Sequence, residues 1–156
     1  MKSFGWLACA VAALSGAMIA RAAPPQQAAV NDAAIMGDGM PRLLSDYGFF
    51  DDAGAQLPVA GVHPYRLNTP LYSDGAEKLR FVYRAAGTQF SAQGEGLLDL
   101  PVGTALIKTF AFGEGSKRRL IETRVLLHRA GGWLALPYLW NDEQTDAQLA
   151  VVGALV

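Results

Sequence analysis

The chain has 156 residues, 17% of them charged, and a formal net charge of −1. This length suffices for one packed domain, and so balanced a charge argues against nucleic acid as a partner. The hydrophobic fraction of 51% would fit a membrane protein, but much of the apolar excess lies in the first 23 residues.

The N-terminal segment has the order of features found in secretory signal peptides. Lys2 precedes an apolar run over residues 4–19, and Ala20-Arg21-Ala22 is a small-x-small cleavage site. We therefore predict a signal peptide over residues 1–22, a periplasmic or secreted mature protein, and no membrane span after signal removal. A retained anchor is the alternative, but the apolar run is shorter than the roughly 20 residues that a bilayer span needs.

The position of the cysteine indicates how the mature domain is stabilised. The only cysteine, Cys9, lies within the predicted signal peptide and is a poor match to a lipidation site. The mature domain must therefore be held together by its core, although an oxidising compartment would permit disulfides. The sequence has no Cys-x-x-Cys-His motif for covalent haem and no Cys/His cluster for zinc.

The next segments predict a linker followed by a short helix. Residues 23–40 are rich in Pro, Gln, Ala, Asn and Gly without an apolar period, which is typical of a linker. In residues 41–50, apolar side chains recur near helical spacing, at Leu43, Leu44, Tyr47 and Phe50. One or two helical turns should therefore pack on the rest of the domain. We assign residues 41–156 to one β-rich domain.

Residues 58–100 predict loops and short strands. Prolines at positions 58, 64 and 70 favour ordered loop and edge structure over a central strand. Alternation in residues 80–84 predicts a strand with Phe81 and Tyr83 on one side. A second strand is expected near residues 89–91. After a turn at residues 94–96, residues 97–100 lead into the next part of the chain.

The strongest pattern is a meander of three strand-forming runs, at residues 105–112, 121–128 and 133–140. Glycine-containing connections at residues 113–117 and 130–132 signal two hairpins. With the earlier strands, this gives five to seven strands and almost no helix. We predict an all-β fold, an antiparallel sandwich or small barrel with a short N-terminal helix. A capped turn at residues 141–147, with Asp142 or Thr145 accepting backbone hydrogen bonds, should follow the third strand.

Strand parity then predicts which side chains share a face. Pairing Phe112 with Arg118 across the first loop places Lys108 opposite Glu122. Pairing Arg129 with Trp133 across the second loop has two further consequences. Arg124 should lie opposite Tyr138, and Glu122 opposite Trp140.

The predicted polar face supplies the candidate binding residues, which are Lys108, Glu122, Arg124, Tyr138, Trp140 and Asn141. In a structural interpretation, Lys108 and Glu122 form a cross-strand charge pair and Arg124 stacks on Tyr138. In a functional interpretation, the two aromatic rings form a platform for a sugar or another polar ligand. The opposite face should form the core, with Ile107, Thr109, Ile121, Thr123, Val125, Leu127, Ala135, Pro137 and Leu139.

No residue combination indicates catalysis or metal binding. His63 and His128 read as loop and strand-end residues, and the pairs Asp74 with Glu77 and Asp142 with Glu143 read as turn residues. We therefore name no catalytic or metal-binding residue and expect no catalytic activity in this chain.

Five segments carry a resemblance to a known family. They are residues 44–50 (LSDYGFF), 64–74 (PYRLNTPLYSD), 101–110 (PVGTALIKTF), 122–124 (ETR) and 138–147 (YLWNDEQTDA). Together they resemble a family of exported bacterial proteins described as dihaem c-type cytochromes, over residues 41–149. In such proteins this β-rich part precedes the haem-binding region, and related modules occur beside secreted dehydrogenase-like domains.

The resemblance implies periplasmic electron transfer, with a haem domain or a periplasmic dehydrogenase as partner. This sequence departs from the family because it has no Cys-x-x-Cys-His motif. It resembles the N-terminal portion of a longer protein or a variant without haem, so haem c is expected only in full-length relatives. Two functions stay open: an accessory β-domain of a periplasmic redox protein, or a β-sandwich module that binds a carbohydrate or another small ligand.

Overall fold

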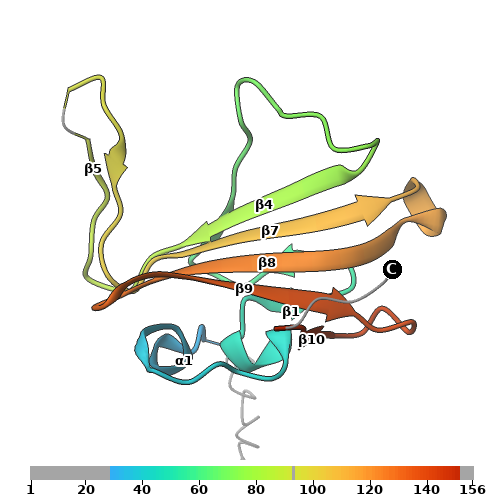
Figure 1. The fold of residues 1–156 in the computed structure, drawn as a ribbon, viewed down its shortest axis with the longest axis horizontal. Coiled ribbons are helices and arrows are strands. Elements are labelled where there is room, and N and C mark those ends of the chain that lie inside the picture. Colours follow the sequence, from blue (N-terminus) through green and yellow to red (C-terminus); the bar gives the residue numbers. More distant parts are fainter. Residues whose placement is uncertain (1–28, 93, 152–156) are drawn as a thin grey trace, which may run out of the picture.

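The computed structural model describes residues 29–92 and 94–151 (Figure 1). The predicted signal peptide and the first residues of the predicted linker lie outside the described residues. In chain order, the elements are α1 (Asp32–Met36), the 3-10 helix η1 (Leu44–Tyr47), β1 (Phe50–Asp52), β2 (Leu57–Pro58), β3 (Val62–Pro64), β4 (Glu77–Tyr83), β5 (Ser91–Ala92), β6 (Leu98–Asp99), β7 (Ala105–Phe112), the 3-10 helix η2 (Gly115–Lys117), β8 (Arg119–Arg129), β9 (Gly132–Trp140) and β10 (Ala147–Leu149).

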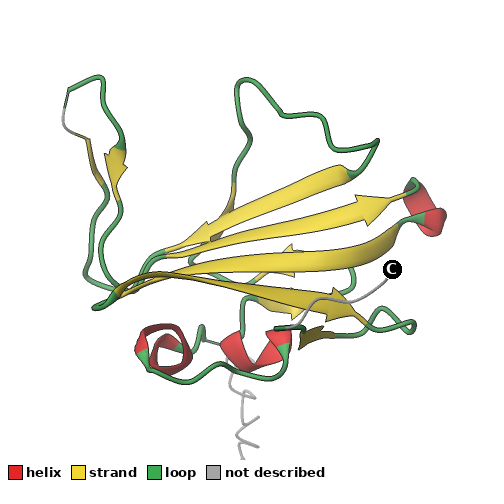
Figure 2. Cartoon of the chain, in the orientation of Figure 1, coloured by secondary structure: helices red, strands yellow, loops and turns green. Residues whose placement is uncertain are grey.

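The fold is centred on one antiparallel sheet of six strands, in the order β10-β9-β8-β7-β4-β3. Two further two-stranded sheets, β1-β2 and β5-β6, are also antiparallel. Strands dominate the described chain and the helices are short, as Figure 2 shows. The predicted all-β antiparallel class with a short N-terminal helix is confirmed. Among the described residues, none of the helices is long and apolar enough to span a membrane.

The core lies between the inner face of the sheet and the N-terminal segments. Strand β7 shows why, because its residues alternate between buried and half-buried positions. Its buried Ile107 and the β8 residue Val125 join a cluster that includes Ile35 of α1 and Tyr47 of η1. Burying a large apolar side chain contributes about 1.5–3 kcal/mol, so α1 and η1 are integral to the domain.

Helix α1 corrects the linker prediction for its last ten residues. Asn31 caps the helix, since its side-chain oxygen accepts from the Ala34 amide at 3.1 Å. At the other end, buried Arg129 of β8 donates to the carbonyl oxygens of Ile35 at 2.8 Å and Gly39 at 2.8 Å. The helix has only five residues, so it depends on these contacts with a distant strand and not on its own propensity.

The one or two helical turns predicted within residues 41–50 are present as η1, a single short 3-10 helix of four residues. Gly48 adopts a left-handed backbone conformation (φ 67°) and ends the helix there. Leu44 and Tyr47 are buried as predicted. The Ser45 hydroxyl donates to the Asp146 carboxylate at 2.5 Å, which joins η1 to the turn before β10.

The predicted strand register is wrong in both hairpins. In the first, Phe112 pairs with Arg119, and a bulge then shifts the ladder so that Lys108 pairs with Arg124. In the second, Arg129 pairs with Gly132 across a two-residue loop. A shift of one residue moves every side chain of a strand to the other face. The face predictions for β9 are therefore reversed: Tyr138 and Trp140 lie on the inner face, whereas Ala135, Pro137 and Leu139 lie on the outer face.

The turn predicted at residues 141–147 is present, with a different capping residue. Its acceptor is Asn141, whose side-chain oxygen accepts from the Thr145 amide at 2.9 Å, and not Asp142 or Thr145. The Asn141 amide also donates to the Asp146 carbonyl at 3.0 Å. The chain then returns along β9 as strand β10.

Candidate functional site

Three cations occupy directly paired positions on neighbouring strands of the six-stranded sheet. Arg80 of β4 pairs with Lys108 of β7, and Lys108 pairs with Arg124 of β8. Paired residues point to the same face of a sheet, here the outer face, opposite the core. We call these three residues the cationic row. Lys78 lies two residues before Arg80 on the same strand and adds a fourth positive charge beside the row.

A single carboxylate offsets part of this charge. Glu122 binds Arg124, with 3.0 Å between Nε and Oε1 and 2.9 Å between Nη2 and Oε2. Arg80 instead donates to the uncharged carbonyl of Lys78 at 3.2 Å. Like charges at opposed positions destabilise a sheet, so the cationic row costs stability in the isolated domain. A ligand or partner that supplies negative charge would relieve that cost.

Phe110 lies between two of these cations. The Lys108 Nζ is 4.5 Å from the centre of its ring, and the Arg124 Cζ is 4.9 Å from it. Both distances fall within the range of cation–π interactions. The pKa of Lys108 is nevertheless lowered, mainly by burial and then by the charges of Arg80 and Arg124. The ring therefore positions the cations without neutralising them.

An apolar area adjoins the cationic row on the same face. Leu126 of β8 and Trp133 of β9 are 37% and 46% exposed. The Trp133 ring stacks on His128, with 4.5 Å between ring centroids and 9° between planes. The His128 ring nitrogen Nδ1 is also held at 2.5 Å from the Leu100 carbonyl, so the stacked pair is fixed in place. Exposed tryptophan and arginine on one face are typical of protein-binding surfaces.

The structure separates the predicted site residues into two groups. Lys108, Glu122 and Arg124 share the outer face, but Glu122 binds Arg124 and not its predicted partner Lys108. Tyr138 and Trp140 lie on the inner face instead. The prediction that Tyr138 and Trp140 form an aromatic platform on the polar face is therefore wrong. The one-residue shift in the second hairpin turns both rings inward.

The inward-facing residues have structural contacts. Tyr138 is fully buried and donates to the Pro41 carbonyl at 3.0 Å. Trp140 donates from Nε1 to the Thr123 hydroxyl at 2.9 Å. Asn141 uses its side-chain amide to donate to the Thr145 hydroxyl at 2.8 Å within its own turn. These three side chains support the fold.

Sequence analysis did not include Arg80, Lys78, Phe110 or Trp133 in the site. Alternation along residues 77–83 does place Lys78 and Arg80 on the face opposite Phe81. What the sequence lacks is the information that β4 pairs with β7, since twenty-one residues and a separate hairpin lie between the two strands.

The geometry gives this face the capacity to bind anionic groups through charge-assisted hydrogen bonds. Within residues 29–92 and 94–151, no three His, Cys, Asp or Glu side chains are grouped so that they could hold a metal ion. Comparisons of the chain with protein-family models, curated proteins and solved structures found no match.

Proposed function

We propose that this chain is an accessory β-domain of a periplasmic redox protein and that its outer sheet face docks an acidic partner. The partner class comes from the sequence resemblance, which implies a haem domain or a periplasmic dehydrogenase. The domain itself positions that partner and carries out no chemistry. Haem c belongs to the partner or to full-length relatives.

The observation that supports docking is the cationic row. Three cations lie on adjacent strands, only one of them binds a carboxylate, and an exposed tryptophan lies on the same face of the sheet. Complementary charge speeds association and selects partners, and electron-transfer complexes commonly use small, salt-sensitive interfaces of this kind. An acidic surface would replace the repulsion within the row by attraction.

The outer face supports docking better than it supports the sugar-binding alternative. A sugar platform on this face needed Tyr138 and Trp140, and both are turned toward the core. The aromatic residue that remains exposed, Trp133, lies beside Leu126 on a broad sheet surface. A broad sheet face with apolar and cationic parts suits a protein partner.

An affinity purification from the periplasm of the native host tests this proposal. The bait is the mature protein, compared with the variant R80S/K108S/R124S. The matched control R42S/K117S/R119S removes three exposed cations outside the row. Bound proteins are identified by mass spectrometry and by their covalent haem absorbance.

Wild-type and control baits should retain a haem protein or a dehydrogenase, and the row variant should not. Raising the salt concentration to about 0.5 M should release it, because the Debye length then falls well below 10 Å. If no redox protein binds, or if the row variant binds as much as the control, the proposed function is wrong.

A further inference from the structure

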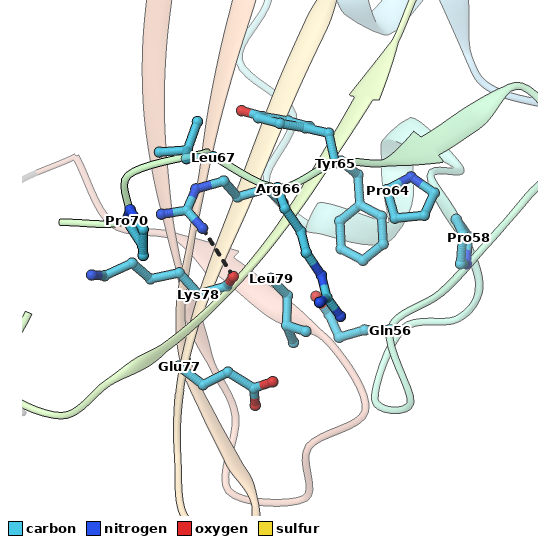
Figure 3. A pocket seen from close by; sticks show the side chains of 12 residues that line it. Gln56, Pro58, Pro64, Tyr65, Arg66, Leu67, Pro70, Glu77, Lys78 and Leu79 are labelled. Carbon is cyan, nitrogen blue, oxygen red and sulfur yellow. Dashed lines mark hydrogen bonds between the residues drawn. The ribbon is translucent and has the colours of Figure 1, made fainter. Parts of the chain in front are cut away.

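A second candidate site lies at the edge of the sheet, away from the apolar part of the outer face. Strand β3 pairs with β4 only at residues 81–83, so residues 77–80 lie beyond the end of β3. The chain beyond β3 curves past this edge, where the Tyr65 amide donates to the Arg80 carbonyl at 3.0 Å. Between these segments is a cavity of about 770 Å³ (Figure 3). That volume is within the range of small-molecule sites.

Positive charge dominates the polar part of the cavity wall. Arg66, Lys78 and Arg80 line it, together with one carboxylate, Glu77. Glu77 lies 3.9 Å from the guanidinium of Arg118, so its charge is shared with a cation outside the wall. Lys78 donates to the Leu71 carbonyl and Arg80 to the Lys78 carbonyl, and neither acceptor carries a charge. The wall therefore favours an anionic ligand.

Gln56 adds a buried acceptor to the same wall. Its residue is only 6% exposed, and its Nε2 donates to the Ala53 carbonyl at 2.7 Å. Its Oε1 is buried and has no hydrogen-bond partner among the described residues. Gln56 also holds a left-handed backbone conformation (φ 56°), which is uncommon for a residue other than glycine. Buried acceptors are nearly always paired, so this oxygen is suited to a ligand's O–H or N–H donor.

The remaining wall is apolar and aromatic. Pro58, Pro64, Pro70 and Leu67 line it together with Tyr65. Such surfaces pack against the C–H faces of a compact organic ligand. A ligand for this cavity therefore combines a carboxylate, hydrogen-bond donors and a C–H framework.

We propose that this edge cavity binds a small sugar acid. Its carboxylate contacts Arg66 and Arg80, and one of its hydroxyl groups donates to Gln56 Oε1. The cavity shares Arg80 with the cationic row. Gln56 and Arg66 lie outside the row, so the two proposals can be tested separately through these two residues. Failure of the sugar-acid proposal would leave the docking proposal standing, and the reverse also holds.

Isothermal titration calorimetry on the intact mature protein tests the proposal with three probes: glucuronate, glucose and acetate. Glucuronate carries both recognition elements, whereas glucose lacks the carboxylate and acetate lacks the hydroxyl groups. Glucuronate should bind with a dissociation constant of about 1 mM or lower, at least about ten-fold tighter than either other probe.

Variants then locate the site. Arg66→Gln and Gln56→Leu should each weaken glucuronate binding about ten-fold, and Gln56→Glu should weaken it further by repelling the carboxylate. Arg42→Gln, at an exposed arginine elsewhere, should leave binding unchanged. Circular dichroism melts confirm that each variant is folded; Arg66 is exposed, so the Arg66→Gln result stands even if a Gln56 variant unfolds.

Three results would each overturn the proposal. They are the absence of saturable glucuronate binding, equal binding of glucose or acetate, and unchanged binding by Arg66→Gln.

Discussion

Replacing Lys108 by methionine should stabilise the isolated domain, because Lys108 is the middle member of the cationic row. It faces Arg80 on one side and Arg124 on the other. Each opposed pair of like charges costs about 0.2–1 kcal/mol, so removing Lys108 relieves that cost twice. The variant also loses the cation–π contact with Phe110, which lowers its stability by about 0.5–1 kcal/mol. Methionine keeps an apolar contact with that ring. The two pairs together cost about 0.4–2 kcal/mol, so we expect the free energy of unfolding to rise by about 0.5 kcal/mol, with an upper value near 1.5 kcal/mol.

Urea denaturation at low salt and at about 0.5 M NaCl measures this effect. Salt screens repulsion between cations, so it should stabilise the wild-type protein more than Lys108→Met. Lys117→Met, at an exposed position on η2, is the control and should change stability by less than about 0.5 kcal/mol. The reasoning is refuted if Lys108→Met loses more than about 1 kcal/mol and keeps the wild-type salt response, since Lys108 would then be a stabilising residue.

Three further predictions concern the buried polar groups. The Thr104 hydroxyl is buried without a partner in the described part of the chain, so Thr104→Val should gain about 1 kcal/mol in urea denaturation. Thr123→Val should lose about 1–3 kcal/mol, because the Thr123 hydroxyl bonds the buried Thr109 hydroxyl and accepts from the half-buried indole N–H of Trp140; the opposite order would contradict this account. Arg129→Met should lose about 3 kcal/mol and expose the α1 amides to hydrogen exchange, since it leaves three carbonyl oxygens without their donor; unchanged α1 protection would argue against it. Burial first, and then the hydrogen bond to Asp32, raises the pKa of Tyr83 to about 12. Between pH 10 and 12 the unfolded chain loses this proton and the folded chain keeps it, so stability should fall by roughly 2–3 kcal/mol, a fall that Tyr83→Phe should reduce; equal alkaline slopes would exclude Tyr83 as the source.

Strand positions could be predicted from local sequence because hydrophobic alternation is a local property. Residues 105–112 match β7 at both ends, and Phe81 and Tyr83 do share the buried face of β4. Strand register depends on details with no comparable signal. The first hairpin has a bulge next to Leu120 and Ile121, two adjacent apolar residues that give no indication of which one leaves the ladder.

The candidate site was predictable only in part for the same reason. Strand parity places Lys108 and Arg124 on one face. The true register differs from the predicted one by two residues at Lys108, and a shift of two residues leaves the face of each side chain unchanged. Arg80 joins them through pairing between strands that are distant in sequence. Helix α1 likewise depends on Arg129, more than ninety residues away, which composition over residues 23–40 could not reveal.

Site-specific photo-crosslinking in the native periplasm tests the central claim most directly. A benzophenone side chain is introduced at Leu126, on the outer face beside the cationic row, and for comparison at Glu143, in the exposed turn before β10. Adducts are identified by mass spectrometry and by haem staining. The account predicts an adduct with a haem protein or a dehydrogenase from position 126 that disappears in the R80S/K108S/R124S background, and no such adduct from position 143. Equal adducts from both positions, or no redox protein at position 126, would contradict docking through the outer face.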